Sequence, residues 1–288
     1  MNPRLLADRL WQILQLDVEG RMRAFMVRRD RAEVMGVAAI VLATVARWLR
    51  LRVMIAPRVG VREGLLYELA ASQMKAPEPE SEQRKIAQVM KAGSETLAHR
   101  VRCDMRHAEQ VRMLALKLFD SLWAYHRMDF ELRTVLESAA TLHDSGHLIN
   151  RKAHHRHGEY LLRYAKLPEL PGWKKTMTAC LIRYHNGKSE PSVRHKLFAS
   201  LSREHRKATR MLAGMLRLAE CLASDHEQAI AGLTLEGGPK DVRVHVELRD
   251  GSRLNLSGIE RKARLLEREL NLQLSFQRVL VVERERVA

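Results

Sequence analysis

Residues 137–150, ESAATLHDSGHLIN, contain the pair of side chains from which a metal site can be predicted. The apolar residues before His143 recur with helical spacing, and Gly146 interrupts that pattern. The stretch therefore predicts a helix that ends at His143 and Asp144. Neutral imidazole and carboxylate groups are the usual ligands of divalent metal ions. A single His-Asp pair also arises by chance, so other parts of the chain have to supply further ligands.

The sequence on both sides of this stretch predicts a series of helices. Asp104 and Asp129 are suitable N-cap residues, and Asn186-Gly187 is a typical helix end. The helices expected from spacing and caps span residues 104–123, 129–144, 157–165, 174–185 and 203–223. The middle of the chain is therefore predicted to be a helical bundle.

Most of the 13 histidines of the chain fall within this helical region. His107 lies one turn inside its helix on the apolar face, His185 ends another helix, and Glu220 lies on the apolar face of the last one. Because the helices of a bundle can bring such side chains to a common point, the ordered set predicts a metal site. A short loop between the helices contains His147, Arg151, Lys152, His154, His155, Arg156 and His157.

Each of these residues also has a purely structural explanation. A single histidine on an apolar face, such as His107, is more often a hydrogen-bonded core residue than a ligand. His147 can act as a cap beside Gly146, and the basic loop can be a solvated surface segment. The order of the whole set along the chain favours the metal site over these alternatives.

The chain of 288 residues contains 50 basic and 34 acidic residues, which gives a net charge of +16. Such an excess favours polyanionic partners: nucleotides, polyphosphate or an anionic membrane surface. Nucleic acid ranks low among them, because only 5% of the residues are aromatic and no recognised binding module is present. Three widely spaced cysteines without a CxxC pair, and a charged amphipathic start, predict a reduced cytoplasmic protein.

The composition divides the chain into four parts. We expect a first part at residues 1–74, a polar linker at 75–84, a helical domain at 85–230 and a smaller C-terminal part at 231–288. In the first part, residues 52–55 are a short strand candidate. The apolar run from Val34 to Ala46 is too short to cross a bilayer, which needs about 20 residues, so it predicts a buried helix.

The C-terminal part changes in character from helical to mixed spacing. Strands are expected at residues 233–236, 242–248, 254–256 and 272–282, with a helix at 259–270. Asp250-Gly251 is a hairpin turn signal between the second and third of these strands. This part is therefore predicted to be a small α+β appendage.

Several stretches of the chain carry a resemblance to known proteins. They are RHAEQVRMLALKLFDSL at 106–122, ESAATLHDSGHLIN at 137–150, HHRHGEYLL at 154–162, LIRYHNG at 181–187, MLRLAECL at 215–222 and ERKARLLEREL at 260–270. Residues 85–284 resemble the HD-domain phosphohydrolases and, more narrowly, the C-terminal region of the exopolyphosphatase and guanosine pentaphosphate phosphohydrolase (Ppx/GppA) family. The resemblance implies a mainly α fold, with an HD-type helical bundle followed by the α+β appendage.

The first part of the chain is similar to another segment of the same family. RDRAEVMGVAAIVLATVARWLRL at 29–51 and GVREGLLYEL at 60–69 resemble the closing segment of its actin-like phosphatase domain. Full-length relatives carry glycine-rich phosphate-binding loops in that domain, and this sequence shows neither loop. The resemblance therefore implies a short helical or α/β remnant that acts as a cap or as a dimer surface, with a homodimer as one outcome.

One position departs from the pattern of HD proteins, in which the last metal ligand is an aspartate. Here that position is Glu220, whose carboxylate reaches one carbon further, and Asp225 is the alternative ligand. The pair His143 and Asp144 is intact, which favours retained chemistry. The expected ligands are thus His107, His143, Asp144 and Glu220, holding Mn²⁺, Mg²⁺, Fe²⁺ or Zn²⁺.

These observations predict a metal-dependent phosphohydrolase that acts on a phosphoanhydride or phosphate ester, such as polyphosphate or a phosphorylated nucleotide. The residues expected to take part in catalysis, as second-ion ligands or in proton transfer, are Asp144, His155, His157 and His185. Those expected to neutralise substrate charge are Arg151, Lys152, Arg156 and Arg183. The alternatives are a module that binds polyphosphate or nucleotides without cutting them, and an accessory or dimerisation protein with a vestigial site.

Overall fold

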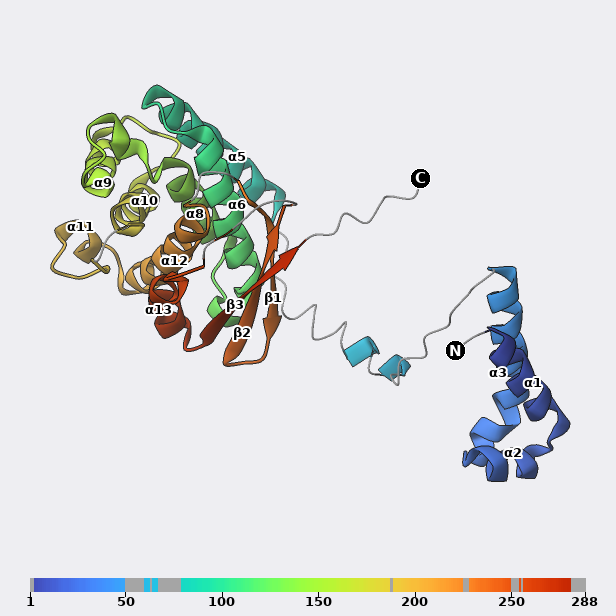
Figure 1. Ribbon diagram of the computed structural model, residues 1–288. Coiled ribbons are helices and arrows are strands. Elements are labelled where there is room, and N and C mark those ends of the chain that lie inside the picture. The colour runs from blue at the N-terminus through green and yellow to red at the C-terminus, as the bar shows by residue number, and fades with distance from the viewer. Residues whose placement is uncertain are drawn as a thin grey trace. The chain divides into compact units, whose positions relative to one another are not determined.

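A computed structural model describes residues 3–49, 60–62, 64–66, 79–186, 189–224, 228–249, 254 and 256–280. The chain forms two compact units, residues Met1–Leu69 and Ala70–Ala288, called here the N-terminal and C-terminal units. Figure 1 shows both, and each is described by itself. The expected strand at 52–55, the turn at Asp250-Gly251 and the alternative ligand Asp225 lie outside the described residues.

Residues 3–49 of the N-terminal unit form the helices α1 (Pro3–Gln15), α2 (Val18–Phe25) and α3 (Arg29–Trp48). Asp17 caps α2 by accepting a hydrogen bond from the Gly20 amide at 2.7 Å. Helix α3 packs against both α1 and α2. The guanidinium of Arg21 links them by donating to the Ile13 and Ala32 carbonyls, at 2.8 and 3.2 Å.

The prediction of a buried helix at Val34–Ala46 is wrong for the single chain. The helix is present, but its buried residues are small ones, among them Ala39 and Ala46, while Val34 and Val37 are exposed. The helix packs closely through alanine and glycine, and the branched side chains that made the run apolar lie on its other side.

The C-terminal unit is mainly helical, with one three-stranded sheet (Figure 1). Its helices are α5 (Ser81–Arg100), α6 (Met105–Ser121), α7 (Trp123–His126), α8 (Phe130–Leu142), the 3₁₀ helix η1 (Ser145–Leu148), α9 (His154–Tyr164), α10 (Gly172–Tyr184), α11 (Lys196–Ala199), α12 (Arg203–Leu222) and α13 (Ile259–Leu270). The strands are β1 (Ile230–Gly237), β2 (Asp241–Leu248) and β3 (Gln273–Leu280). The expected mainly α fold with a C-terminal α+β appendage is confirmed at this level.

Side-chain caps explain where the principal helices begin. Asp104 accepts from the backbone amides of Arg106 and His107, and Asp129 accepts from that of Leu132. Each cap satisfies amides that have no partner within the helix. Both caps were predicted, and they fix the residues at which α6 and α8 begin.

Helix α8 lies at the centre of the bundle, in contact with α5, α6, α10 and α12. Eight of its residues are buried, including Val135, Leu136 and Ala139. Helix α12 is buried over most of its length and contacts α6, α10 and α13. Burial of apolar surface on this scale is the main stabilising term of such a fold. The residues that end α8 and those near the end of α12 are therefore held on a rigid framework.

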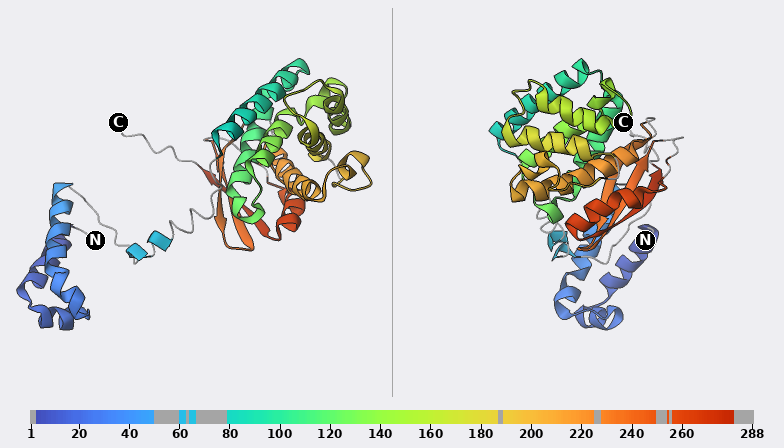
Figure 2. Two further views of the ribbon diagram at one scale, coloured as in Figure 1. Left: turned by 180° about the vertical axis from the view of Figure 1, so that it is seen from behind. Right: turned by 90° about the vertical axis from the view of Figure 1, so that its left-hand side faces the viewer.

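The sheet lies along one side of the bundle, where β1 packs against α6 and α13 packs against α12 (Figures 1 and 2). Strands β1 and β2 pair in an antiparallel hairpin, and β3 pairs with β2 in parallel through the crossover helix α13. Alternate residues of β2, from Val242 to Leu248, are buried against the helices. The buried amide of Gln110 donates to the Ile230 carbonyl at 2.9 Å and ties the sheet to α6.

Some details of the appendage differ from the sequence prediction. The hairpin turn lies between Gly237 and Asp241, where the Gly238 amide donates to the Asp241 carbonyl at 3.0 Å. Leu254 and Leu256 form no strand, and β3 takes the place beside β2 that they were expected to fill. A parallel neighbour requires a crossover, and the helix at 259–270, which was predicted, provides it.

The expected linker is shorter than its composition indicated. Helix α5 begins at Ser81, so residues 81–84 are helical. Glu80 and Gln83 form a capping box, in which Glu80 accepts from the third amide of the helix and Gln83 accepts from the Glu80 amide. The two prolines and three glutamates of the stretch were interpreted as linker composition, although Glu80 and Gln83 within it start a helix.

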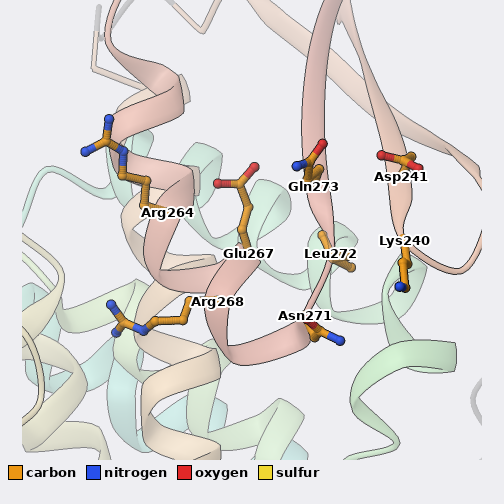
Figure 3. A pocket seen from close by; sticks show the side chains of 8 residues that line it. All are labelled: Lys240, Asp241, Arg264, Glu267, Arg268, Asn271, Leu272 and Gln273. Atoms are coloured by element: carbon orange, nitrogen blue, oxygen red, sulfur yellow. The ribbon is translucent and has the colours of Figure 1, made fainter.

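A cavity of about 540 Å³ lies between the end of α13 and the start of β3 (Figure 3). Its principal charged groups already have partners: Arg268 pairs with Glu190 at 2.8 Å, and Glu267 accepts from the Leu274 amide at 2.8 Å. The pair Arg268–Glu190 connects the appendage to the bundle. None of the expected ligands or catalytic residues lines this cavity.

Candidate metal centre

Three helices bring the expected ligands together inside the C-terminal unit. His107 comes from the first turn of α6, His143 and Asp144 directly follow α8, and Glu220 comes from the last turn of α12. The Glu220 Oε2 atom lies 3.1 Å from the Nε2 atoms of both His107 and His143. Asp144 Oδ2 lies 3.4 Å from the Nε2 of His143 and 3.9 Å from that of His107. Residues 113 positions apart in the chain are thus in direct contact.

A second group of histidines faces the other oxygen of the same aspartate. Asp144 Oδ1 lies 3.3 Å from His154 Nε2 and 3.7 Å from His185 Nε2. The two Nε2 atoms are 3.1 Å from each other. His147 approaches from the surface, with its Nδ1 3.6 Å from Asp144 Oδ2. Asp144 therefore lies between two sets of imidazoles, with one carboxylate oxygen toward each.

Backbone hydrogen bonds fix the proton positions of three of these rings. The Nδ1 of His143 lies 2.7 Å from the Ala140 carbonyl, that of His185 lies 2.6 Å from the Ile182 carbonyl, and that of His154 lies 3.0 Å from the Arg151 carbonyl. A carbonyl oxygen can only accept, so each Nδ1 carries the proton. In the neutral ring, the lone pair then belongs to Nε2, which points into the cluster. Metal-binding histidines in proteins commonly show this arrangement.

Two glycines allow the helical elements of the second group to approach closely. A Cβ atom on Gly146 would lie 1.9 Å from the His154 carbonyl oxygen and 2.5 Å from the Gly158 nitrogen. Gly158 is also constrained, because its Cβ would lie 2.7 Å from a methyl group of Ile182. Because neither glycine has a side chain, η1 can lie close to the start of α9. The rings of His147 and His154 then have centroids 4.3 Å apart.

The charges of the cluster are strongly coupled. Burial alone would raise the pKa of Glu220, but the nearby charge of His143 and the hydrogen bond from His107 outweigh it and hold that pKa below its usual range. The pKa of Asp144 is likewise lowered by His143 in spite of burial. Both acids are therefore carboxylates at neutral pH. They offer oxygen ligands of full negative charge in a site that is largely shielded from water.

The pKa values of His143 and His185, one from each group, are shifted in opposite directions. Burial disfavours a charged His143, but Glu220 and Asp144 together raise its pKa well above 6.5. Burial and the neighbouring His143 lower the pKa of His185 to about 3. Both rings are completely buried. His185 is therefore a neutral imidazole at every physiological pH, with an Nε2 lone pair available to a cation.

The spacing of these atoms fits a divalent ion. Four ligands at about 2.1 Å from a tetrahedral ion lie roughly 3.4 Å from one another. Ligand atoms of His107, His143 and Asp144 all lie within 4.8 Å of one another, as do those of Asp144, His147 and His154. The Nε2 atom of His143 is buried and has no hydrogen-bond partner among the described residues. The donor set and this orphaned nitrogen both fit a bound metal ion.

The structure separates the histidines of the expected loop. Helix α9 begins at His154 rather than at residue 157, so these histidines form its first turn. His155 touches the cluster only through a ring contact with His154, at 5.7 Å between centroids. Within the described residues, His157 has no hydrogen bond, ion pair or ring contact with the cluster. His147 and His154 were not assigned as ligands from the sequence. They lie closer to Asp144 than His155 and His157, which were assigned as ligands of a second ion.

The expected substrate-binding residues fall into two classes. Arg151, Lys152 and Arg156 are exposed, on the segment that leads from η1 into α9. Arg183 instead donates to the buried carboxylate of Glu159 at 2.6 Å, and His195 contacts the other oxygen of that carboxylate at 3.1 Å. The guanidinium of Arg183 is thus held in an internal ion pair, whereas the other three cations face solvent.

Arg217 is a buried residue near the site that the sequence did not suggest. Its guanidinium donates to the Tyr184 carbonyl at 2.7 Å and also to the Ser189 carbonyl. Tyr184 directly precedes His185, and Arg217 lies one turn before Glu220 on α12. A buried cation held by carbonyls caps the end of α10 and fixes the distance between the two helices that carry His185 and Glu220.

Comparison with known proteins identifies the fold that carries this site. The family described as "Ppx/GppA phosphatase, domain III" matches residues 89–274, which include all the histidines and acids of the cluster. The chain belongs to the Ppx/GppA phosphatase family. The match confirms the narrower of the two resemblances seen in the sequence. It spans the helical bundle and most of the appendage of this Ppx/GppA chain.

A curated relative supports the same assignment. The guanosine-5'-triphosphate,3'-diphosphate pyrophosphatase of Pseudoalteromonas atlantica (strain T6c / ATCC BAA-1087) is 32% identical over 122 residues. The aligned region covers 42% of this chain and 23% of that relative, so this Ppx/GppA protein matches about a quarter of the relative's length. Among the described residues, no helix is both long and apolar enough to span a membrane.

Proposed function

We propose that this protein is a cytoplasmic, metal-dependent phosphohydrolase that cleaves a phosphoanhydride or phosphate ester, with an HD-type centre in its helical bundle. The single observation that carries the proposal is the convergence of imidazole Nε2 atoms on the carboxylates of Asp144 and Glu220. Three imidazoles have their Nδ1 protons bound to backbone carbonyls and direct the other nitrogen toward the two carboxylates. A metal ion bound among these atoms would replace the proton that the two carboxylates otherwise hold on His143.

The two oxygens of Asp144 suggest two metal positions. His107, His143, Glu220 and Asp144 Oδ2 would hold one ion, and His154, His185 and Asp144 Oδ1 would hold the other, with His147 beside the pair. Such a nitrogen-rich set favours Mn²⁺, Fe²⁺ or Zn²⁺ over Mg²⁺, which prefers oxygen ligands. Glu220 takes the place of the expected aspartate, and its Oε2 lies 3.1 Å from two imidazoles.

A bound divalent ion would lower the pKa of a water molecule and screen the charge of phosphoryl oxygens. The protein's own groups would supply the rest. The side chain of His147 is 41% exposed, the most open of the cluster. Burial lowers its pKa, only partly offset by Asp144, so its ring is neutral at pH 7 and can accept a proton at the mouth of the site. Asp144 orients the surrounding rings through both of its oxygens.

The substrate would be a phosphorylated polyanion. Arg151, Lys152 and Arg156 are exposed beside the cluster and carry no ion pair with a described residue, so they remain free to neutralise phosphate. Polyphosphate and guanosine pentaphosphate are the first candidates, because the family is one of phosphatases and the relative is a guanosine pyrophosphatase. His155 and His157 are proposed to orient the phosphate, whereas Arg183, already paired with Glu159, supports the fold around His185.

A phosphate-release assay with defined metals tests the proposal. The full chain would be stripped of metal, reloaded with Mn²⁺, Fe²⁺, Zn²⁺ or Mg²⁺, and supplied with polyphosphate, guanosine pentaphosphate, ATP and a phosphomonoester. We expect turnover with at least one pair of metal and substrate, and a loss of at least 100-fold in Asp144→Ala. His99→Ala, which removes an exposed histidine of α5, is the matched control and should retain full activity.

A second candidate function is binding of the same polyanions without cleavage. The exposed cations beside the site and the glutamate at the last ligand position favour it. Metal content and polyphosphate affinity distinguish the two functions. If the native protein holds metal and binds polyphosphate but releases no phosphate from any substrate, and Asp144→Ala binds polyphosphate as tightly, the module is a binding domain and the enzyme proposal is rejected.

A further inference from the structure

A cavity of about 770 Å³ lies between helices α1, α2 and α3 of the N-terminal unit. Most of the side chains that line it are apolar, among them Ile13 of α1, Phe25 of α2, and Met35 and Leu42 of α3. Small-molecule sites in proteins have volumes of about 300–1,000 Å³ and linings that are mostly apolar. The cavity therefore has the size and the lining of a ligand site, and it belongs to a different unit of the chain from the candidate metal centre.

The wall that α3 contributes to this cavity is long and narrow. Its residues begin at Arg31, recur with the spacing of one helix face and end at Leu42. Between these two residues the helix rises roughly 16 Å, at about 1.5 Å per residue. On α1, Arg9 and Ile13 line the cavity one turn apart. An elongated apolar space of this kind fits an extended chain better than a compact ring system.

Two arginines line the cavity, whereas none of the described residues that line it is acidic. Within the described part of the chain, the guanidinium of Arg31 has no hydrogen bond and no ion pair. The guanidinium of Arg9 donates to the neutral side-chain amide of Gln12 at 2.9 Å. The cavity thus combines an apolar lining with two positive charges that no carboxylate balances, which complements an anionic head group on an apolar tail.

The acids that are nearest to Arg31 in sequence are already paired with other residues. Asp30 lies 3.2 Å from Arg28, and Glu33 lies 3.3 Å from Arg29. An unpaired arginine on an open surface is common and needs no partner, because water solvates it well. Arg31 differs from such a residue because it lies on the wall of an apolar cavity, where a cation can hold the charged end of a ligand.

We propose that this cavity binds a free long-chain fatty acid, with the carboxylate on Arg31 and the acyl chain extended along α3 toward Leu42. A guanidinium and a carboxylate can form two parallel hydrogen bonds. Each methylene group that leaves water stabilises the complex, and the flexible side chain of Met35 can adjust to the chain. Arg9 adds a second positive charge from the α1 side. A phospholipid bilayer would contact the outer surface of the helices instead of the space between them.

Calorimetric titration of the full chain with three probes tests the proposal. Laurate has the chain and the negative charge, acetate has the charge alone, and dodecyltrimethylammonium has the chain with a positive charge. We expect laurate to bind with a dissociation constant of about 100 µM or tighter, the strength with which a single acyl chain binds a bilayer. Acetate and the cation should not bind at the same concentrations. A native protein that binds no laurate, or that binds the cation equally well, overturns the proposal.

Two variants with matched controls test the position of the ligand. Arg31→Gln should weaken laurate binding at least tenfold, whereas Arg28→Gln, which changes an arginine outside the cavity, should not. Ala38→Phe should abolish binding by filling the cavity, because Ala38 lines it. Val37→Phe is its control, since Val37 is 66% exposed and does not line the cavity. Circular dichroism should show the same helix content in all four variants. Unchanged laurate affinity in Arg31→Gln or in Ala38→Phe overturns the proposal.

A vesicle assay distinguishes a free fatty acid from a membrane surface. The native chain and Ala38→Phe would be sedimented with phosphatidylglycerol vesicles. We expect neither protein to sediment with the vesicles, because the ligand enters the cavity as a single molecule. If both proteins sediment equally with the vesicles and the native chain binds no laurate, the two arginines belong to a membrane contact and the fatty-acid site is rejected.

Discussion

The Nε2 atoms of His154 and His185 lie 3.1 Å apart, although both rings donate their Nδ1 protons to backbone carbonyls. Two neutral rings would direct lone pairs at each other there, and a cation bound between them and the carboxylate of Asp144 would relieve that repulsion. We therefore expect His154→Ala to lose one bound Mn²⁺ per chain while the ion near His107 remains. Plasma mass spectrometry after dialysis measures this. A native protein that holds no metal, or a variant with unchanged stoichiometry, contradicts it.

Glu220 contacts two imidazoles at once, and its replacement tests the other position. We expect Glu220→Ala to weaken Mn²⁺ binding by at least tenfold, because the first group then loses a carboxylate. Glu220→Asp should retain more of the affinity than Glu220→Gln, since charge matters more than length at this contact. Isothermal titration of the metal-free protein gives the three constants. Equal affinity in all three variants would show that Glu220 is not a ligand.

Metal affinity should rise with pH. Glu220 and Asp144 raise the pKa of His143 well above 6.5 in spite of its burial, so this ring carries a proton in the metal-free protein at neutral pH. An ion has to displace that proton to reach Nε2. The affinity should therefore increase by up to tenfold for each pH unit below the pKa of His143. Titrations in buffers of different ionisation enthalpy would count the proton released. A flat affinity between pH 6 and 8 would disprove the coupling.

Among the described glycines, Gly146 is the one at which an added methyl group should reduce the free energy of unfolding the most. A Cβ there would overlap the His154 carbonyl, a backbone atom that cannot move without shifting α9. We expect Gly146→Ala to destabilise the fold by about 3 kcal/mol or more. Gly238→Ala is the matched control, because its Cβ meets nothing within 4 Å, and its midpoint of chemical denaturation should be unchanged. Equal midpoints for both variants would contradict the close approach of η1 and α9.

His126 should make the stability of the C-terminal unit depend on pH independently of any metal. Burial lowers its pKa from 6.5 to about 4, opposed in part by the Phe119 carbonyl and Asp120. The unfolded chain takes up this proton below pH 6.5 and the folded chain only near pH 4. Stability is thus complete above pH 6.5 and falls between these values, by up to about 1.4 kcal/mol per unit.

The variant His126→Gln isolates this contribution. Glutamine can still donate toward the Phe119 carbonyl and accept from the Met128 amide, as His126 does at 2.8 and 2.9 Å. Its unfolding free energy should fall less steeply between pH 6.5 and 4 than that of the native protein. His99→Gln is the control, and it should follow the native slope. Identical slopes for all three proteins would contradict the assignment.

Local signals allowed the helices to be predicted well. Asp104 and Asp129 cap the helices that they were expected to cap, and α13 has the predicted bounds. Periodicity and caps act within a few residues, so the sequence displays them directly. The start of α9 was placed too late, because Ala153 adopts a left-handed conformation that no glycine or proline announces.

The less predictable features depend on contacts between distant residues. His147 and His154 lie at the cluster because Gly146 lets η1 approach α9 closely. The spacing of residues in the sequence does not reveal this approach. The interior use of Arg183 depends on Glu159, a buried acid from another helix. The exposure of the valines on α3 depends on which side its neighbours cover. In each case the residue type allowed several roles, and the contact with a distant part of the chain determined which role the residue has.

The pairing of β3 with β2 has a consequence for synthesis of the protein. A hairpin of β1 and β2 can form as soon as it leaves the ribosome, but its parallel neighbour is made only after α13. Until then, β2 presents unpaired backbone amides and carbonyls to any strand nearby. During that interval nascent chains on a crowded polysome would be exposed to one another, and prompt emergence of β3 would protect them from mispairing.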